Sequence, residues 1–205
     1  LLACNHAGVE PKAVGEDAKQ THADTKLTRA SAQSTKAANR LVIGSFEKQR
    51  KFPDMPVQGT VVGGLKWQDK LGENLVFFSQ RDSEIEPNEG LDIPDLPARN
   101  RALFAAHYLK PSDGSATVLK RLVRDAVGPC QFDLTARYLK DSFGVTDLDK
   151  NGVGEATFAY ELACTSDVSP KTLKLLMLEG GDKYILRGTR VTSIGRGKTN
   201  GGDFT

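Results

Sequence analysis

The stretch "TVVGGLKWQDKLGENLVFFSQ" (residues 60–80) contains two runs of β-branched, aromatic and aliphatic residues on either side of a short polar segment. Such runs are typical of β-strands, and the polar segment with its glycine supplies turn chemistry. Residues 60–80 therefore predict a β-hairpin with Gly72 in the turn. The run "NLVFF" is almost continuously apolar, so we expect at least one strand to be covered on both faces.

Three further segments repeat this pattern. The residues "PSDGS" separate "RALFAAHYLK" from "ATVLKRLV", and "GGD" separates "KLLMLE" from "KYILRGTRV". Residues 143–162 predict a hairpin as well, with an aspartate-rich turn. Four successive hairpins predict a mainly β domain over residues 39–205, an antiparallel meander of hairpins. A propeller-like fragment, a curved single sheet and a barrel all fit this pattern, and an α+β fold is the alternative.

The first residues resemble the end of a secretory signal. "LLAC" (residues 1–4) is similar to the lipobox of bacterial lipoproteins, and this resemblance implies that Cys4 is acylated, with palmitate-type chains that anchor the protein to a membrane. Asn5 stands where lipoproteins kept in the inner membrane often carry Asp, so the resemblance implies the outer membrane. Residues 5–38 lack aromatic residues and predict a flexible tether between the anchor and the domain.

Overall composition excludes some classes of function. The chain has 28 basic and 26 acidic residues, and no segment combines basic with aromatic residues as a nucleic-acid groove would. We therefore expect no nucleic-acid partner. No apolar run approaches the roughly 20 residues that a membrane-spanning helix needs.

The cysteines divide into two groups. If Cys4 is acylated, Cys130 and Cys164 remain, and an exported protein meets the oxidising conditions in which two such thiols form a disulfide. The spacing alone leaves two separate buried thiols as the alternative.

The stretch "TDLDKNGVGEATF" (residues 146–158) places oxygen donors at alternate positions, followed by a glycine and a carboxylate. Hard oxygen ligands in this order suit Ca²⁺, with the glycine making the sharp turn. The predicted ligands are the side chains of Asp147, Asp149, Asn151 and Glu155 and the backbone carbonyl of Val153. Phe158 occupies the place of the last EF-hand glutamate, and Glu155 instead resembles the acidic residue of the short calcium loops between strands of integrin-type propellers. The alternative is an Asx turn whose carboxylates accept from backbone amides.

Residues 141–189, which contain the aspartate loop, "CTSDVSP" and "LEGGDKYILRG", resemble a poorly characterised bacterial family of exported proteins labelled surface polysaccharide biosynthesis proteins. The resemblance covers about a quarter of the chain. It implies an envelope location and an association with surface glycans, and it supplies no reaction or catalytic residues.

We expect a non-enzymatic envelope lipoprotein, stabilised by Ca²⁺, that binds or assembles with surface polysaccharide or an envelope protein. One alternative is a hydrolase of envelope glycans that uses carboxylates of the acidic segment "RDSEIEPNEGLDIPDLPARN" (residues 81–100) near Trp67 or His107. Under that reading Trp67 would stack on a sugar ring, although packing in a hairpin is the simpler role for it. A subunit of a surface polymer or complex is a further alternative.

Overall fold

The structure is a computed structural model that describes residues 41–44, 46 and 55–205, all within the unit Lys36–Thr205. The predicted lipobox with Cys4 and the predicted tether at residues 5–38 lie outside the described residues. No helix long and apolar enough to cross a membrane occurs in the described part of the chain.

The described residues form strands and no helix. Their bounds are β1 (Val42–Gly44), β2 (Thr60–Gln68), β3 (Gly72–Ile85), β4 (Ala98–Pro111), β5 (Val118–Cys130), β6 (Asp133–Thr146), β7 (Glu155–Thr165), β8 (Thr172–Glu179), β9 (Asp182–Thr189), β10 (Thr192–Gly195) and β11 (Lys198–Asn200). Strands β1 to β5 make one antiparallel sheet in chain order, here called sheet I, and β6 to β9 make a second, sheet II. Strands β10 and β11 pair separately.

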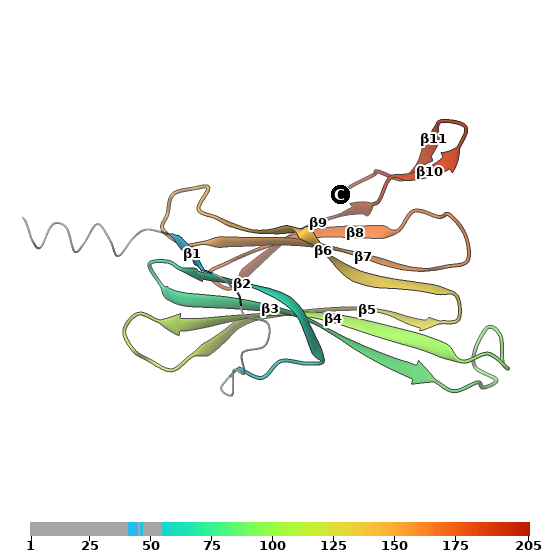
Figure 1. The fold of residues 1–205 in the computed structure, drawn as a ribbon, viewed down its shortest axis with the longest axis horizontal. Coiled ribbons are helices and arrows are strands. Elements are labelled where there is room, and N and C mark those ends of the chain that lie inside the picture. The colour runs from blue at the N-terminus through green and yellow to red at the C-terminus, as the bar shows by residue number, and fades with distance from the viewer. Residues whose placement is uncertain (1–40, 45, 47–54) are drawn as a thin grey trace, which may run out of the picture. The chain divides into compact units, whose positions relative to one another are not determined.

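All four predicted hairpins are present, as β2–β3, β4–β5, β6–β7 and β8–β9. The turns use the glycines that the sequence supplies: Gly72, Gly152 and Gly181 have φ values of 142°, 81° and 113°, a region that side chains disfavour. The predicted mainly β class with antiparallel hairpins is therefore confirmed. The meander is divided between two layers, which Figure 1 shows one above the other.

The core lies between the two sheets. Phe78 of sheet I packs with Tyr138 and Phe158 of sheet II, with ring centroids 5.0 Å and 4.9 Å away, and all three side chains are buried. Alternate residues of each strand point into this layer, as in other β-sandwiches. Burial of these aromatic side chains is the main attraction between the sheets.

Sheet I is also covered on its outer face. Leu75 and Phe77 point away from the sandwich core and pack, with Ala106 and Tyr108, against residues of the segment before β2. The covering side chains are Phe46, Met55 and Val57. Because Leu75, Val76, Phe77 and Phe78 are each at most 3% exposed, the prediction that "NLVFF" is covered on both faces is confirmed.

The acidic segment is more regular than its sequence indicates. Strand β3 continues to Ile85 and β4 begins at Ala98, so only residues 86–97 form an irregular loop. Asp82 and Glu84 lie on β3, directly opposite Arg101 and Arg99 of β4. Cross-strand pairs of opposite charge stabilise this extension of the hairpin.

Cys130 at the end of β5 and Cys164 near the end of β7 form the predicted disulfide, with Cα atoms 5.6 Å apart. The bond joins sheet I to sheet II, close to where the chain passes from one sheet to the other.

Candidate metal centre

The candidate metal centre lies in the loop between β6 and β7, residues 147–154. Lys150 and Gly152 have φ values of 59° and 81°, and these two left-handed residues turn the chain sharply. The Asp149 carboxylate accepts a hydrogen bond of 3.0 Å from the backbone N–H of Asn151, an Asx turn that helps to hold Lys150 in this conformation. The loop therefore folds back on itself instead of extending the strands.

The fold gathers three of the predicted ligands. Carboxylate oxygens of Asp147, Asp149 and Glu155 lie within 4.8 Å of one another. Glu155 is 3% exposed, whereas Asp149 is exposed to solvent. The cluster therefore has a buried base, formed by the first residue of β7, and an open side.

Hydrogen bonds also fix the other two carboxylates, those of Glu155 and Asp147. Glu155 accepts from the N–H of Leu148 at 2.9 Å and from the hydroxyl of Thr146 at 2.8 Å. Asp147 accepts from the N–H of Gly152 at 3.2 Å. These hydrogen bonds by themselves hold the carboxylates close to one another.

Asn151, another predicted ligand, makes its side-chain hydrogen bonds within the loop and to sheet II. The amide oxygen of Asn151 accepts from the N–H of Val153 at 2.7 Å, and its amide nitrogen donates to Asp149 at 2.8 Å and to Glu179 of β8 at 2.6 Å. The Asn151 side chain thus braces the loop against sheet II.

The oxygens present suit a hard divalent cation. Two carboxylates at this separation repel each other by roughly 3 kcal/mol at an effective dielectric constant of about 20. No lysine, arginine or histidine among the described residues forms an ion pair with Asp147, Asp149 or Glu155. A cluster of this kind fits Ca²⁺, which accepts flexible oxygen coordination, better than Mg²⁺, which requires a strict octahedron.

The loop is anchored to sheet I by a residue that the sequence analysis did not single out. Asp69, 2% exposed, accepts from the N–H of Gly154 at 3.0 Å and from the indole of Trp67 at 3.0 Å. A Cβ atom at Gly154 would lie 2.4 Å from the Trp67 indole nitrogen, so glycine is required there. The ammonium group of Lys70 donates to the carbonyl of Asn151 at 2.5 Å.

Trp67 and His107 lie inside the fold. Trp67 is 1% exposed, its ring centroid is 5.2 Å from that of His107, and the Nε2 atom of His107 is 2.9 Å from the Asn74 side-chain oxygen. Burial lowers the pKa of His107 to about 4. A buried tryptophan cannot stack on a sugar at the surface. Trp67 instead packs inside the fold, which is the simpler role considered for it.

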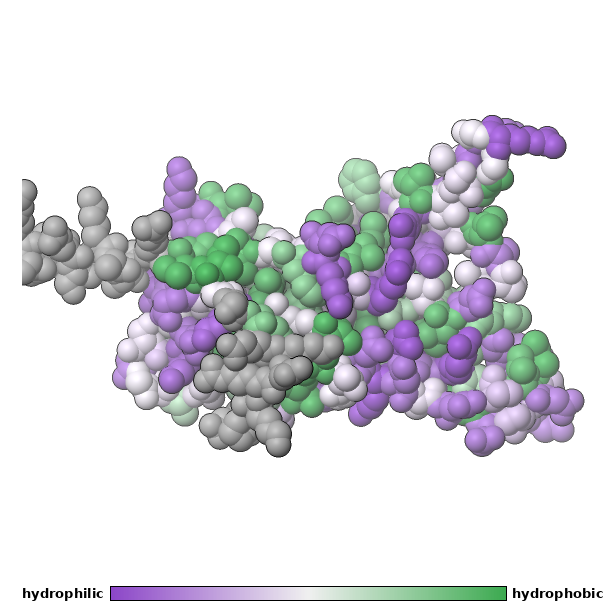
Figure 2. Space-filling model, viewed as in Figure 1, coloured by the Kyte–Doolittle hydropathy of each residue, from purple (hydrophilic) through white to green (hydrophobic). Residues whose placement is uncertain are grey.

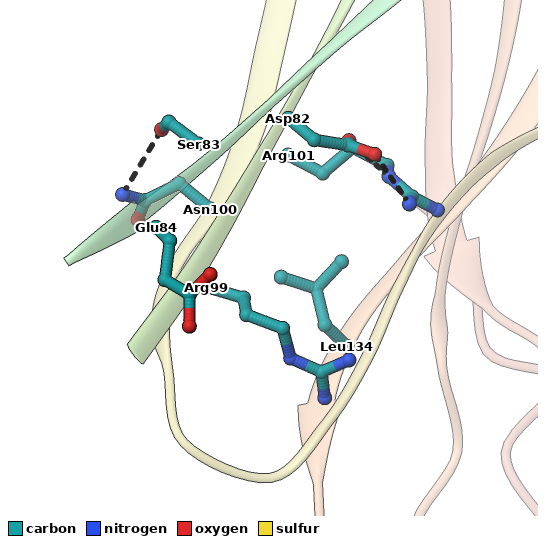
Figure 3. Close-up of a pocket in the computed structure, with 7 residues that line it drawn as sticks. All are labelled: Asp82, Ser83, Glu84, Arg99, Asn100, Arg101 and Leu134. Atoms are coloured by element: carbon teal, nitrogen blue, oxygen red, sulfur yellow. Dashed lines mark hydrogen bonds and ion pairs between the residues drawn. The ribbon is translucent and has the colours of Figure 1, made fainter. Parts of the chain in front are cut away.

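A cleft at the other end of β3 holds two of the acidic residues considered for hydrolysis, Asp82 and Glu84. It measures about 330 Å³ and is lined by Asp82, Ser83, Glu84, Arg99, Asn100, Arg101 and Leu134 (Figure 3). Arg101 donates to Asp82 at 2.5 Å and 2.8 Å, and these hydrogen bonds lower the pKa of Asp82. A general acid needs a raised pKa. The cleft also lies eight residues along β3 from Asn74, the partner of Trp67, or roughly 27 Å away.

A second charged cluster, also missed from the sequence, lies on the outer face of sheet II. The side chain of Glu161 is fully buried beneath cationic side chains, with Arg137 Nε at 2.6 Å, Arg190 Nη1 at 2.8 Å and Lys171 Nζ at 3.7 Å. Burial acts to raise the pKa of Glu161, but the hydrogen bonds from Arg137 and Arg190 outweigh it, and the pKa is lowered.

Comparison of the chain with models of known protein families, with curated proteins and with solved structures gave no match. The interpretation of residues 147–155 as a metal site therefore depends on the residues of the loop alone.

Proposed function

We propose that the protein is a cell-envelope lipoprotein whose β-sandwich is stabilised by Ca²⁺ and acts as a binding or assembly module. The observation that carries the proposal is the group formed by Asp147, Asp149 and Glu155, three carboxylates within 4.8 Å of one another. Their repulsion is relieved by a divalent cation, and no cation among the described residues pairs with them.

The role assigned to the ion is structural. The loop rests on the buried Asp69 and Trp67 of sheet I and, through Asn151, on Glu179 of sheet II. An ion at this place would tighten a loop that contacts both sheets, because binding to the folded state alone stabilises that state. The backbone bonds already made to Glu155 and Asp147 reduce the reorganisation that binding requires.

The envelope location has separate support. A disulfide between Cys130 and Cys164 suits an oxidising compartment. The resemblance of "LLAC" to a lipobox and of residues 141–189 to exported surface polysaccharide proteins points in the same direction. The proposed partners are accordingly the membrane, through acylated Cys4, and a surface polysaccharide or an envelope protein.

Thermal unfolding in calcium and in EDTA tests the metal. At a calcium concentration 100 times the Kd, binding adds about 2.7 kcal/mol, which for a chain of this size raises Tm by about 5 to 10 °C. Glu155→Gln should abolish this difference. Asp113→Asn is the matched control. Asp113 is an exposed turn aspartate outside the cluster, and its carboxylate accepts a hydrogen bond from the N–H of Ser115. Equal melting of the wild type in calcium and in EDTA would remove the metal from the proposal.

Terbium luminescence provides a second readout that does not depend on stability. Trp67 is the only tryptophan and lies against Gly154 of the loop, so Tb³⁺ bound there should be sensitised by excitation of the indole. Calcium should displace Tb³⁺ and so reduce the luminescence. Glu155→Gln should also reduce the luminescence, and Asp113→Asn should leave it unchanged.

A further inference from the structure

The two sheets differ in what covers their outer faces. On sheet I the outward-facing Leu75, Phe77 and Tyr108 are buried by the segment before β2, whereas Leu119 and Leu122 of β5 on the same face are 48% and 43% exposed. On sheet II the outward-facing Leu175, Leu186 and Tyr184 are 44%, 44% and 51% exposed, and none of the described elements lies over them.

These residues form one continuous surface. Leu176 and Leu178 belong to the core, so alternation along β8 turns Leu175 and Met177 outward. Leu175 is paired with Leu186, and Met177 with Tyr184, on the neighbouring strand β9. We call this surface the sheet II stripe and define it as Leu173, Leu175, Met177, Tyr184 and Leu186. In Figure 2, green residues reach the upper margin of the molecule, above this sheet, between purple groups.

Charge is distributed unequally along the stripe. At one end Arg137, Lys171 and Arg190 surround Glu161, three positive charges against one negative charge, which leaves +2. At the other end the outward-facing Glu179 and Asp182 face each other across β8 and β9, while Lys120 and Arg121 of β5 approach the intervening Gly181 from sheet I. Among the outward-facing side chains, the stripe thus runs from a basic end to an acidic end.

We propose that the sheet II stripe docks a second copy of the chain, with the strands of the two copies antiparallel. A two-fold interface brings the same patch of both copies together, so the patch must complement itself. A two-fold axis across the strands sets the basic end of each copy over the acidic end of the other and stacks the leucines at the centre. An axis along the strands would superpose like charges, which costs binding energy.

The apolar stripe supplies the attraction, since an interface needs a buried apolar centre with a polar rim. The charged ends determine the orientation. None of the five stripe residues belongs to the carboxylate group of the loop, and only Glu179 at the acidic end contacts that loop, through Asn151.

Molar mass measured by light scattering over a wide range of concentrations tests the dimer. The wild type should pass from monomer to dimer as concentration rises, and added salt should weaken the dimer. Leu175→Asp and, separately, Tyr184→Lys should remain monomeric with an unchanged melting temperature. The matched control is Leu119→Lys, an equally exposed apolar residue on sheet I (48%), which should dimerise like the wild type. A wild type that stays monomeric, or a dimer that survives both stripe variants, overturns the proposal.

Cross-linking tests the antiparallel orientation. In a Cys4→Ser background, chains with Lys171→Cys are mixed with chains carrying Asp182→Cys and treated with a short bismaleimide. Cross-links should join the two kinds of chain, and neither kind should cross-link to itself. Self-linking of each variant would show a parallel arrangement and overturn the proposed one. Asp182→Lys alone should weaken the dimer about tenfold or more, because the two-fold axis repeats each lost contact.

Discussion

The carboxylate of Asp69 accepts a 3.0 Å hydrogen bond from the backbone N–H of Gly154, which joins the β2–β3 turn of sheet I to the β6–β7 loop of sheet II. The same carboxylate accepts from the N–H groups of Leu71 and Gly72 and from the Trp67 indole. A buried carboxylate with N–H donors on both oxygens is stable without a cationic partner. Asp69 therefore fixes where the candidate metal loop lies relative to sheet I.

Asp69→Ala should lower the free energy of unfolding by about 3 kcal/mol or more. The substitution leaves buried N–H groups of Trp67 and Gly154 without an acceptor, and each such group costs about 1 to 3 kcal/mol. Asp69→Asn keeps one acceptor oxygen and should cost less. Urea denaturation measures both, with Asp113→Asn as the control for loss of a turn carboxylate. If Asp69→Ala were as stable as that control, the link between the sheets would contribute nothing.

His107 should make the fold sensitive to mild acid. Its pKa is lowered from 6.5 to about 4, because burial disfavours the charged ring; Asp69 opposes this shift and Lys120 adds to it. As pH falls below 6.5 the unfolded chain takes up the proton before the folded one does. The lowered pKa of His107 therefore contributes about 3 kcal/mol to the free energy of unfolding. This contribution is fully present above pH 6.5 and declines between pH 6.5 and pH 4.

The measurement compares unfolding free energies of the wild type and His107→Gln at pH 7 and near pH 4. Carboxylates titrate in both proteins, so the difference between the two pH dependences isolates the imidazole. The wild type should lose more stability on acidification than the variant. Parallel pH profiles would mean that His107 is not held neutral by burial.

Local features of the structure follow from the sequence, whereas contacts between distant segments do not. Gly72 and Gly152 indicate the positions of their turns, because the conformation of a hairpin turn depends on residues that are neighbours in the sequence. The link from Asp69 to Gly154 spans 85 positions and is created by sandwich packing, so no local pattern indicates it. The aspartate at the start of "DKLG" signals an Asx turn and nothing beyond it.

The alternation of inward and outward positions along a strand also predicts the wrong burial for residues that are covered by side chains from distant segments. Glu161 alternates with the core residues Tyr160 and Leu162, which predicts an exposed side chain, yet it is fully buried. The side chains that cover it come from β6 and from the segments that flank β8 and β9. The prolines at positions 87, 94 and 97 favour a loop over residues 81–100, but the pairing of Asp82 with Arg101 extends the strand.

The cluster around Glu161 should respond asymmetrically to substitution. Replacing Arg137 and Arg190 together by glutamine leaves a buried carboxylate with only Lys171 at 3.7 Å, and breaking a buried pair in this way costs about 3 to 5 kcal/mol. Glu161→Gln should cost less, because the freed cations are already partly exposed, at 58% and 49%, and regain water. Adding Glu161→Gln to the double arginine variant should therefore restore stability instead of lowering it further. Chemical denaturation of the four proteins forms a double-mutant cycle, and additive losses would show that the arginines do not neutralise Glu161.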